Sequence, residues 1–372
     1  MQSGPTHNAL SGGRSARELE LMKLDRKHAW LMLALIMACV GFTHVFGNDS
    51  AASRAIGGIQ LRREANISME KERLTISEAK VTVEYEFLNQ TDQNITTEVA
   101  FPIPPYDVGF LDAGGTRDFG DFRLWVEGKE LKYSVDVRAK LRGRDYTDLL
   151  KSLGIDIASF GHLDFDRGEG HPTGQITKVP KGPRDQLIRL GLISGPDDSP
   201  PGLPGWEDVK TYSWMQTFPA HRVLHVRHEY TPSIGFGMTF PSELNPKQAL
   251  PSDISGGIEN LCIDPSLQKE LTNQAIKNYK PGEAAPLETV WVDYILTTAN
   301  SWKTPIKDFT LIIDRRKDSQ RIGGAALQYV SLCWDGPIQK LDADHFLAHK
   351  TNFVPKKELR VTFFSFLMPP DK

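Results

Sequence analysis

Hydrophobic and polar residues alternate along much of the chain between Ile59 and Val137. The clearest case is Lys80–Leu88, where valine, tyrosine and phenylalanine occupy every second position, with polar residues between them. Since successive side chains of a strand point to opposite faces, this pattern predicts an antiparallel strand with one buried face and one face in water. The turn-forming run Asn89–Asn94 follows. A second strand is predicted at Ile95–Phe101, and the prolines after it end that strand.

Other segments of strand character extend this organisation. Phe122–Val126 and Leu131–Val137 flank a Glu-Gly-Lys turn and predict a hairpin. Strands are also predicted at 209–218, 221–231, 288–298, 308–314, 329–334 and 358–366. We therefore expect a mainly β protein, with an antiparallel β-sandwich over residues 48–240 and a smaller β-rich α+β part over residues 241–372.

Two stretches depart from the strand pattern. Residues 143–205 are rich in Gly, Pro and Asp around a short predicted helix at Asp145–Leu153, which indicates a helical and loop insertion over one end of the sheet. A second helix is predicted at about 264–279. Asp264 is a good N-cap residue and Pro265 suits the first helical turn.

An apolar run at Ala29–Phe46 follows Arg26 and Lys27 and gives way to polar residues after Gly47. This order is the layout of a secretory signal peptide over residues 1–47, and it predicts a periplasmic or secreted protein. Met22 would open a signal peptide of ordinary length, so it is an alternative start. The other alternative is an uncleaved segment that anchors the chain in the inner membrane, the one membrane contact that we expect.

Composition narrows the class of protein. The chain has 372 residues and a formal net charge of −3, so it can bury a sizeable core and gives no reason to expect nucleic acid as a partner. Cys262 and Cys333 remain beyond the apolar run. An even pair of cysteines in an oxidising compartment predicts a disulfide, and two buried free thiols are the alternative.

His221, His225 and His228 suggest a metal site at first sight. The residues around them alternate as in a strand, where four residues span about 13 Å. That span is too long for one zinc ion with bonds of about 2 Å to each ligand. His228 would also lie on the opposite face. We therefore expect two surface histidines and one histidine beside the core, with no metal and no other cofactor.

The segment 162–171 holds the densest set of oxygen ligands. Asp164, Asp166 and Glu169 lie in a glycine-rich run that has features of an acidic calcium loop. Gly168, however, stands where a third side-chain ligand would be expected. An exposed turn with solvated acids is the alternative to a calcium site.

The same loop provides the weak catalytic candidates. Asp164 or Asp166 with His162 or His171 would serve a hydrolase, because two carboxyl groups about 5–10 Å apart can cleave glycosidic bonds. The chain has no Gly-x-Ser-x-Gly nucleophile motif, no Cys-x-x-Cys pair and no phosphate-binding loop that ends in Lys-Ser/Thr.

Aromatic residues offer a second kind of site. Trp206, Tyr212 and Trp214 cluster in the sequence near Phe218 and follow a Pro-Pro-Gly run. Such residues can form a platform for a carbohydrate or a peptide. The alternative is that they cap the core of the β-sandwich.

Short motifs follow one another over the chain from residue 48 onward. They include Asn48-Asp-Ser50, Val99-Ala-Phe-Pro102, Thr217-Phe-Pro-Ala220, His228-Glu-Tyr-Thr-Pro232, Ala299-Asn-Ser-Trp302 and Asn352-Phe-x-Pro355. Their order resembles a family of exported bacterial proteins that is defined by domain of unknown function 4424. The resemblance implies export and an envelope setting, and it implies no catalytic role for any residue.

A more distant resemblance covers about residues 59–240. The alternating strand, the asparagine-centred turn and Phe101-Pro-Ile-Pro104 are similar to the vault/inter-alpha-trypsin-type β-sandwich. The adhesion domain that usually accompanies that module carries a metal-binding Asp-x-Ser-x-Ser motif, which the chain lacks. The resemblance therefore implies the sandwich fold and leaves the adhesion role aside.

The sequence thus favours an exported, non-catalytic binding or structural protein, with an envelope protein or a glycan as its partner. This expectation rests on a strand-rich scaffold without a convergent set of nucleophile, base and metal ligands. The alternative is an envelope hydrolase that acts on glycan or cell-wall material through the carboxylates of the insertion loop.

Overall fold

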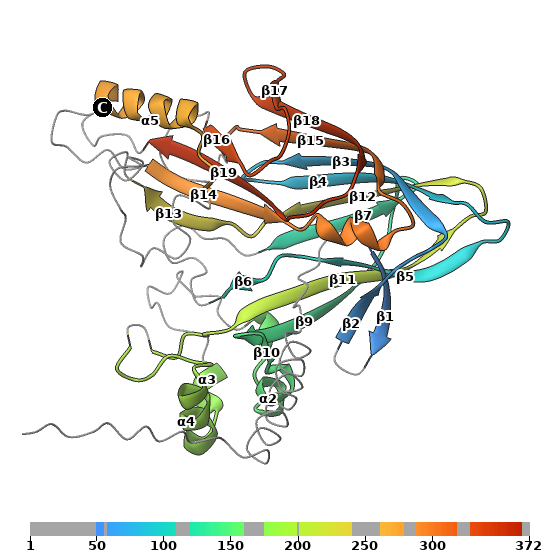
Figure 1. Ribbon diagram of the computed structural model, residues 1–372. Helices are drawn as coiled ribbons and strands as arrows, with labels where there is room; N and C mark the ends of the chain where they lie inside the picture. The colour runs from blue at the N-terminus through green and yellow to red at the C-terminus, as the bar shows by residue number, and fades with distance from the viewer. Residues whose placement is uncertain are drawn as a thin grey trace, which may run out of the picture. The chain divides into compact units, whose positions relative to one another are not determined.

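The computed structural model describes residues 50–55, 58–108, 119–159, 175–198, 201–239, 261–278, 287–317 and 328–366. Strands dominate these ranges and form three sheets within them, which confirms the expectation of a mainly β protein (Figure 1). The predicted signal peptide lies outside the described residues. No helix within the described ranges is long and apolar enough to cross a membrane.

The first sheet has seven strands, all antiparallel to their neighbours. Its order is β10-β9-β11-β5-β1-β2, with β6 paired to the start of β11. The strands are β1 (Ser50–Ala55), β2 (Gly58–Arg62), β5 (Ile95–Pro102), β6 (Tyr106–Asp107), β9 (Ser134–Leu141), β10 (Arg144–Asp145) and β11 (Glu207–Phe218). The proline-terminated strand predicted from the sequence is β5.

The second sheet has eight strands in the order β17-β18-β15-β3-β4-β12-β7-β8. They are β3 (Ile67–Ile76), β4 (Val81–Asn89), β7 (Gly120–Val126), β8 (Lys129–Glu130), β12 (Val223–Thr231), β15 (Ile306–Asp314), β17 (Gln339–Lys340) and β18 (His345–Phe353). The alternation seen in the sequence of β4 is an alternation of burial: every second side chain is buried.

The first two sheets pack face to face, as a β-sandwich does, and aromatic rings fill the space between them. Phe122 of β7 stacks on Tyr212 of β11, with ring centroids 4.1 Å apart. Phe87 of β4 meets Phe218 of β11 edge to face at 5.8 Å. Such pairs stabilise a core beyond the area that they bury. The sandwich predicted from period-two alternation is therefore confirmed.

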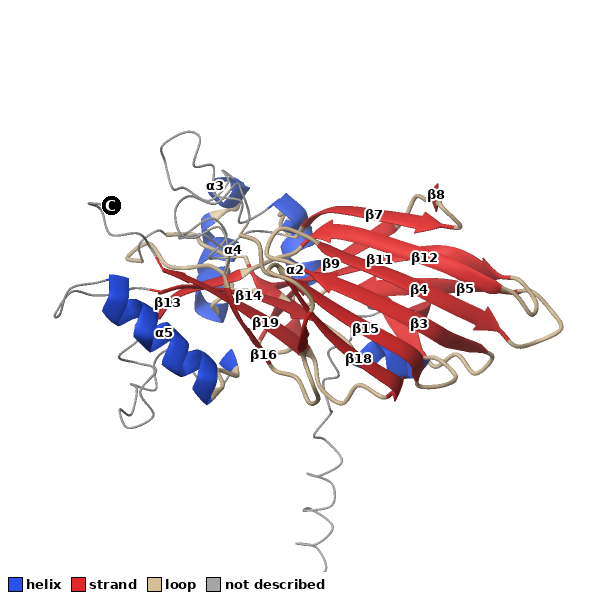
Figure 2. Cartoon of the chain, turned by 90° about the horizontal axis from the view of Figure 1, so that it is seen from above, coloured by secondary structure: helices blue, strands red, loops and turns tan. Residues whose placement is uncertain are grey.

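The third sheet has four strands and adds a layer. Its order is β13-β14-β19-β16, and its strands are β13 (Gly235–Thr239), β14 (Leu287–Tyr294), β16 (Tyr329–Leu332) and β19 (Leu359–Phe366). Val292 and Phe363 join the sandwich core, whereas Phe364 and Phe366 pack with Leu271 of helix α5 (Pro265–Asn278). Because both faces of β19 are covered, all of its side chains but that of Arg360 are buried; α5 lies beside this sheet in Figure 2.

The predicted second helix is α5, and its start is as expected. Asp264 Oδ1 accepts hydrogen bonds from the backbone N–H groups of Ser266 at 2.7 Å and Leu267 at 2.9 Å. The bond from the Ser266 hydroxyl contributes most to lowering the pKa of Asp264. The carboxylate thus caps two amides that have no partner within the helix.

One pairing was not expected from the sequence. β3 and β15 run parallel, from the pair Lys71–Asp308 to the pair Ile76–Ile313. This pairing brings a strand from each side of the predicted boundary near residue 240 into one sheet. Parallel pairing needs a long connection between the strands, so no local turn signal announces it.

Two local predictions were wrong in detail. β7 forms its hairpin with the short β8, and the chain then crosses to the first sheet, where β9 pairs with β11. The predicted strand 288–298 ends at Tyr294 and is followed by a 3-10 helix, η4 (Thr297–Ser301). The Glu358 carboxylate accepts the backbone N–H groups of Leu296 and Thr297, which replaces ladder bonding there.

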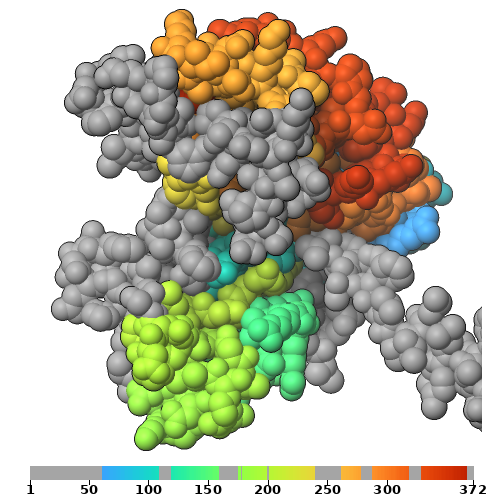
Figure 3. Space-filling view, turned by 60° about the vertical axis from the view of Figure 1, so that its left-hand side comes forward, coloured from blue at the N-terminus to red at the C-terminus, as the bar shows by residue number. Residues whose placement is uncertain are grey.

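The predicted insertion contains short helices on the surface (Figures 1 and 3). They are α2 (Thr147–Ser152), η1 (Ile157–Ser159), α3 (Gln175–Lys178) and α4 (Lys181–Leu190). The short helix predicted from the sequence is α2, whereas α3 and α4 were not predicted. Leu150 and Leu187 are fully buried in the main core and fix this segment to the sandwich.

Candidate functional site

The structure describes the residues of the predicted aromatic cluster but not those of the predicted acidic loop. His162, Asp164, Asp166, Glu169 and His171, the catalytic and calcium candidates, lie outside the described residues. Within the described part of the chain, no group of three or more His, Cys, Asp or Glu side chains could hold a metal ion.

The aromatic cluster lies inside the protein. Trp206 is 0%, Tyr212 7% and Trp214 5% exposed. The indole N–H of Trp206 donates to Asp208 at 3.2 Å, and Trp214 contacts the ring of His228 edge to face. These side chains therefore form no exposed platform. They lie in the sandwich core, as the alternative interpretation has it.

Two of the three histidines, His225 and His228, lie in β12, whereas His221 lies in the turn before that strand, which begins at Val223 and not at residue 221 as predicted. His221 and His225 are exposed and contact Asp92 at 2.7 Å and Glu127 at 3.2 Å, respectively. His228 is fully buried on the opposite face of β12. Burial lowers the pKa of His228 to about 3, since a charged imidazolium would lose its hydration there.

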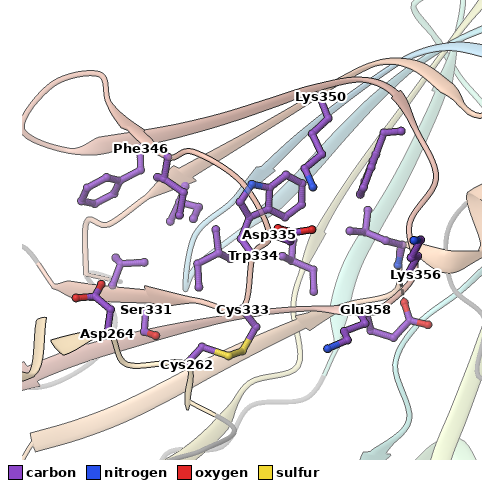
Figure 4. A pocket seen from close by; sticks show the side chains of 18 of the residues that line it. Cys262, Asp264, Ser331, Cys333, Trp334, Asp335, Phe346, Lys350, Lys356 and Glu358 are labelled. Carbon is purple, nitrogen blue, oxygen red and sulfur yellow. Dashed lines mark hydrogen bonds between the residues drawn. A yellow bond between two sulfur atoms is a disulfide. The ribbon is translucent and has the colours of Figure 1, made fainter. Parts of the chain in front are cut away.

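A large pocket lies between the second and third sheets. Its volume is about 1070 Å³, at the upper end of the range for small-molecule sites. Its walls come from the segment between β16 and β17, from β18, and from the segment between β18 and β19 (Figure 4). We call it the Trp334 pocket, after the tryptophan drawn near its centre.

The floor of the Trp334 pocket is apolar. Leu296, Ile313 and Leu359 are each no more than 2% exposed and line it from three different elements or their ends. Ile338 and Val354 line it as well and are 44% and 46% exposed. A ligand would therefore cover aliphatic surface that is now in water, which favours binding by about 25 cal/mol per Å².

The disulfide forms part of one wall. Cys262, before α5, is bonded to Cys333, just after β16, which confirms the predicted pair. The Ser331 hydroxyl also donates to the Leu261 carbonyl and reinforces this junction. The bond spans 71 residues in sequence, and such a cross-link contributes about 4 kcal/mol by restricting the unfolded chain. It therefore fixes the residue that precedes Trp334.

Two phenylalanine rings pack against Trp334. Phe309 of β15 stacks on Trp334 with ring centroids 5.8 Å apart, and Phe353 of β18 lies 5.6 Å away. The ammonium of Lys350 sits 4.5 Å from the centre of the Trp334 ring and 5.1 Å from that of Phe353. This geometry is a cation–π interaction, and it holds a positive charge inside the pocket.

Trp334 carries an unused hydrogen-bond donor. Its Nε1 atom is buried and has no hydrogen-bond partner among the described residues. Gly336 lies close by with φ of 140°, and a Cβ there would come within 3.4 Å of Nε1 and 3.3 Å of Lys350 Cε. The positive φ therefore favours glycine, and a Cβ would also crowd Trp334 and Lys350. A buried donor without a partner costs about 1–3 kcal/mol.

The Trp334 pocket is lined by four lysines and three acids. Lys340, Lys350, Lys356 and Lys357 line it, and none of them makes an ion pair with a described residue. Of its three acids, Asp264 caps α5 and Glu358 accepts from Leu296, Thr297 and the Thr297 hydroxyl. Asp335 is thus its one acid without such a role in the described chain. A hydrogen-bonded carboxylate is still an anion, so the lining holds four lysines against three acids and has a small excess of cations.

Sequence reasoning missed this pocket. Trp334 is adjacent to Cys333, which was singled out, but the lysines that line the pocket are spread over residues 340–357, in β17, in β18 and in the segment after β18. β18 itself was not predicted. A tryptophan next to a disulfide cysteine is the one local signal that could have marked the place.

The fold and the pocket define a mainly β protein with a ligand-sized cavity between two of its sheets. The chain belongs to the family described as domain of unknown function (DUF4424), whose model matches residues 47–362. This membership confirms the resemblance found in the sequence. The vault/inter-alpha-trypsin-type resemblance stays a prediction.

The solved structures that resemble the chain include one with a descriptive title. It is a "putative nutrient binding protein" from Legionella pneumophila, with a TM-score of 0.35 and 13% sequence identity. The match covers 85% of the present chain and 72% of the other. No curated protein matches the sequence.

Proposed function

We propose that the chain is an exported, non-catalytic binding protein whose ligand site is the Trp334 pocket. The observation that carries this proposal is the make-up of the pocket: an apolar floor, an aromatic wall and charged side chains beside them. Small-molecule sites have this composition, in which apolar contact supplies affinity and a few polar groups fix orientation.

The hydrogen bonds made by the acids of the Trp334 pocket favour a binding role over hydrolysis there. A hydrolase of the glycosidase type needs two carboxyl groups free to transfer protons or attack. In the Trp334 pocket Asp264 and Glu358 are each held by hydrogen bonds from backbone N–H groups. Their carboxylates therefore stabilise the local structure. Asp335 then has no second free carboxylate among the residues that line the pocket, and a glycosidase needs two.

Export is supported by the sequence pattern before residue 48 and by the disulfide. Disulfides persist in oxidising compartments such as the periplasm or the exterior of the cell. Cys262 is exposed and Cys333 is half-buried, so the bond would be accessible to cytosolic reductants. We accordingly propose a periplasmic or secreted location, and an envelope protein or a glycan as a further partner.

A fluorescence titration tests the ligand site. The probe is N-phenyl-1-naphthylamine, a neutral apolar dye whose emission rises in apolar surroundings. We expect saturable binding to the wild-type protein and at least about tenfold weaker binding to Trp334→Ala, since the aromatic wall supplies 1–3 kcal/mol of contact.

Trp125→Ala is the matched control. Trp125 is also a half-buried tryptophan, but it lies in β7 and does not line the Trp334 pocket. The guanidinium carbons of Arg123 and Arg227 lie 4.7 Å and 4.9 Å from the centre of its ring. Its replacement should leave the titration unchanged. Absence of saturable binding, or equal loss in both variants, would contradict the Trp334 pocket as the ligand site.

A further inference from the structure

The Trp334 pocket combines features that suit one chemical class of ligand. We propose that it binds a free, water-soluble anionic amphiphile: a molecule with an aliphatic or aromatic body and one carboxylate or phosphate group. This inference rests on the proposed function above and adds the charge and the shape of the ligand.

Charge complementarity is the first argument. Four lysines line the Trp334 pocket against three acids, and two of those acids, Asp264 and Glu358, accept hydrogen bonds from backbone N–H groups of the local structure. Lys356 and Lys357 follow Pro355 in the segment between β18 and β19, and both are exposed. Opposite charges attract most strongly where water is partly excluded, so an anion gains most beside Lys350, which is half-buried.

The position of Lys350 is the second argument. Its ammonium rests on two aromatic rings and forms no ion pair with a described residue. A cation–π contact is weaker than a charge-assisted hydrogen bond to a carboxylate or phosphate. An anionic group that enters the pocket therefore draws Lys350 away from the rings and forms the stronger bond.

Trp334 completes the head-group site. When Lys350 moves off the ring, the neighbouring Nε1 donor becomes accessible to the same anionic group. The donor then gains the partner that it lacks within the described chain. Binding thus removes the cost of a buried, unsatisfied N–H group, which the unliganded protein bears.

The apolar floor accommodates the body of the ligand. Leu296, Ile313 and Leu359 lie at the base, and Ile338 and Val354 continue the aliphatic surface to the rim. A hydrophilic anion such as inorganic phosphate would leave this surface in water. An amphiphile covers it, and each methylene group buried adds about 0.8 kcal/mol.

The test compares two ligands of equal carbon number that differ in the head group, a charged carboxylate or a neutral hydroxyl. Decanoate and decanol share an aliphatic chain, and each is titrated against the protein loaded with N-phenyl-1-naphthylamine. We expect decanoate to displace the dye at about tenfold lower concentration than decanol, and this preference to shrink as salt is added.

Variants assign the preference to individual groups. Lys350→Met keeps the length of the side chain and removes its charge, and Trp334→Phe keeps a ring and removes the N–H donor. We expect both to reduce the preference for decanoate by about three- to tenfold, with displacement by decanol nearly unchanged. Lys129→Met, at an exposed position in β8, is the control and should keep the preference.

Each outcome decides something. Equal displacement by decanoate and decanol would overturn the anionic class and leave the proposed function standing. If the dye does not bind saturably, or neither ligand displaces it, both proposals are overturned. Cosedimentation with phosphatidylglycerol vesicles, without displacement by monomeric decanoate, would overturn the free ligand and indicate a membrane head group.

Discussion

The buried histidine of β12 makes a sharp prediction about acid stability. His228 is fully buried and surrounded by aromatic rings: Phe101 at 4.9 Å, Phe122 at 5.3 Å, Trp214 at 5.3 Å and Tyr85 at 5.5 Å between ring centroids. We expect His228→Phe to reduce the loss of stability that the protein suffers on acidification. The replacement keeps a ring in an aromatic surrounding and removes the titrating group.

The magnitude follows from the two pKa values. The unfolded chain titrates this histidine near 6.5, whereas burial lowers its pKa to about 3 in the folded protein. Between these values the unfolded state binds a proton that the folded state does not, so a fall in pH favours unfolding. The contribution of neutral His228 is complete above pH 6.5 and is lost progressively towards pH 3. Between about pH 7.5 and 4.5 this loss is about 3 kcal/mol.

The assay is urea unfolding of both proteins at about pH 7.5 and about pH 4.5, with the disulfide intact. The free energy of unfolding of the wild-type protein should fall by about 3 kcal/mol more than that of His228→Phe. Carboxylates that titrate in this interval are common to both proteins and cancel in the comparison. Equal losses in the two proteins would show that His228 is not held neutral by burial, and the reasoning would fail.

Three further results are expected. Gly235→Ala should lower the free energy of unfolding by about 1–3 kcal/mol, because its Cβ would lie 1.9 Å from the indole of the tryptophan opposite. Gly237→Ala in the same strand would place a Cβ 3.7 Å from that ring and should lower it less in the same urea titration. Replacing Cys262 and Cys333 together by serine should lower the free energy of unfolding by about 4 kcal/mol; an unchanged calorimetric midpoint would contradict this. Asp264→Ala should cost about 1 kcal/mol by uncapping α5, and full stability would show that the cap is dispensable.

Local patterns of the sequence were enough to predict many of the elements. The alternation in β4, the proline end of β5 and the aspartate cap of α5 each depend on residues a few positions apart. The position of His228 on the buried face of β12 follows from the same period of two. The cysteine pair could be predicted because its compartment was inferred from the residues that precede the strands.

The Trp334 pocket could not be predicted in this way. Trp334, Lys350 and Lys357 come from three different segments of the chain. They meet because β15 pairs parallel with β3 while β16 pairs with β19 in another sheet. Pairing between strands that are distant in sequence depends on the whole set of packed faces and leaves no periodic trace in either strand.

The interior position of the aromatic cluster likewise depends on tertiary packing and not on local sequence pattern. The sequence placed Trp206, Tyr212 and Trp214 on or beside one strand, β11, and left open whether that strand's aromatic residues face water or core. Packing of the second sheet against the first buries them. The sequence by itself therefore determined strand periodicity, helix caps and the cysteine pair, which are set by local chemistry. Only the tertiary structure decided which aromatic and charged side chains meet in a cavity, because that depends on how whole sheets are brought together.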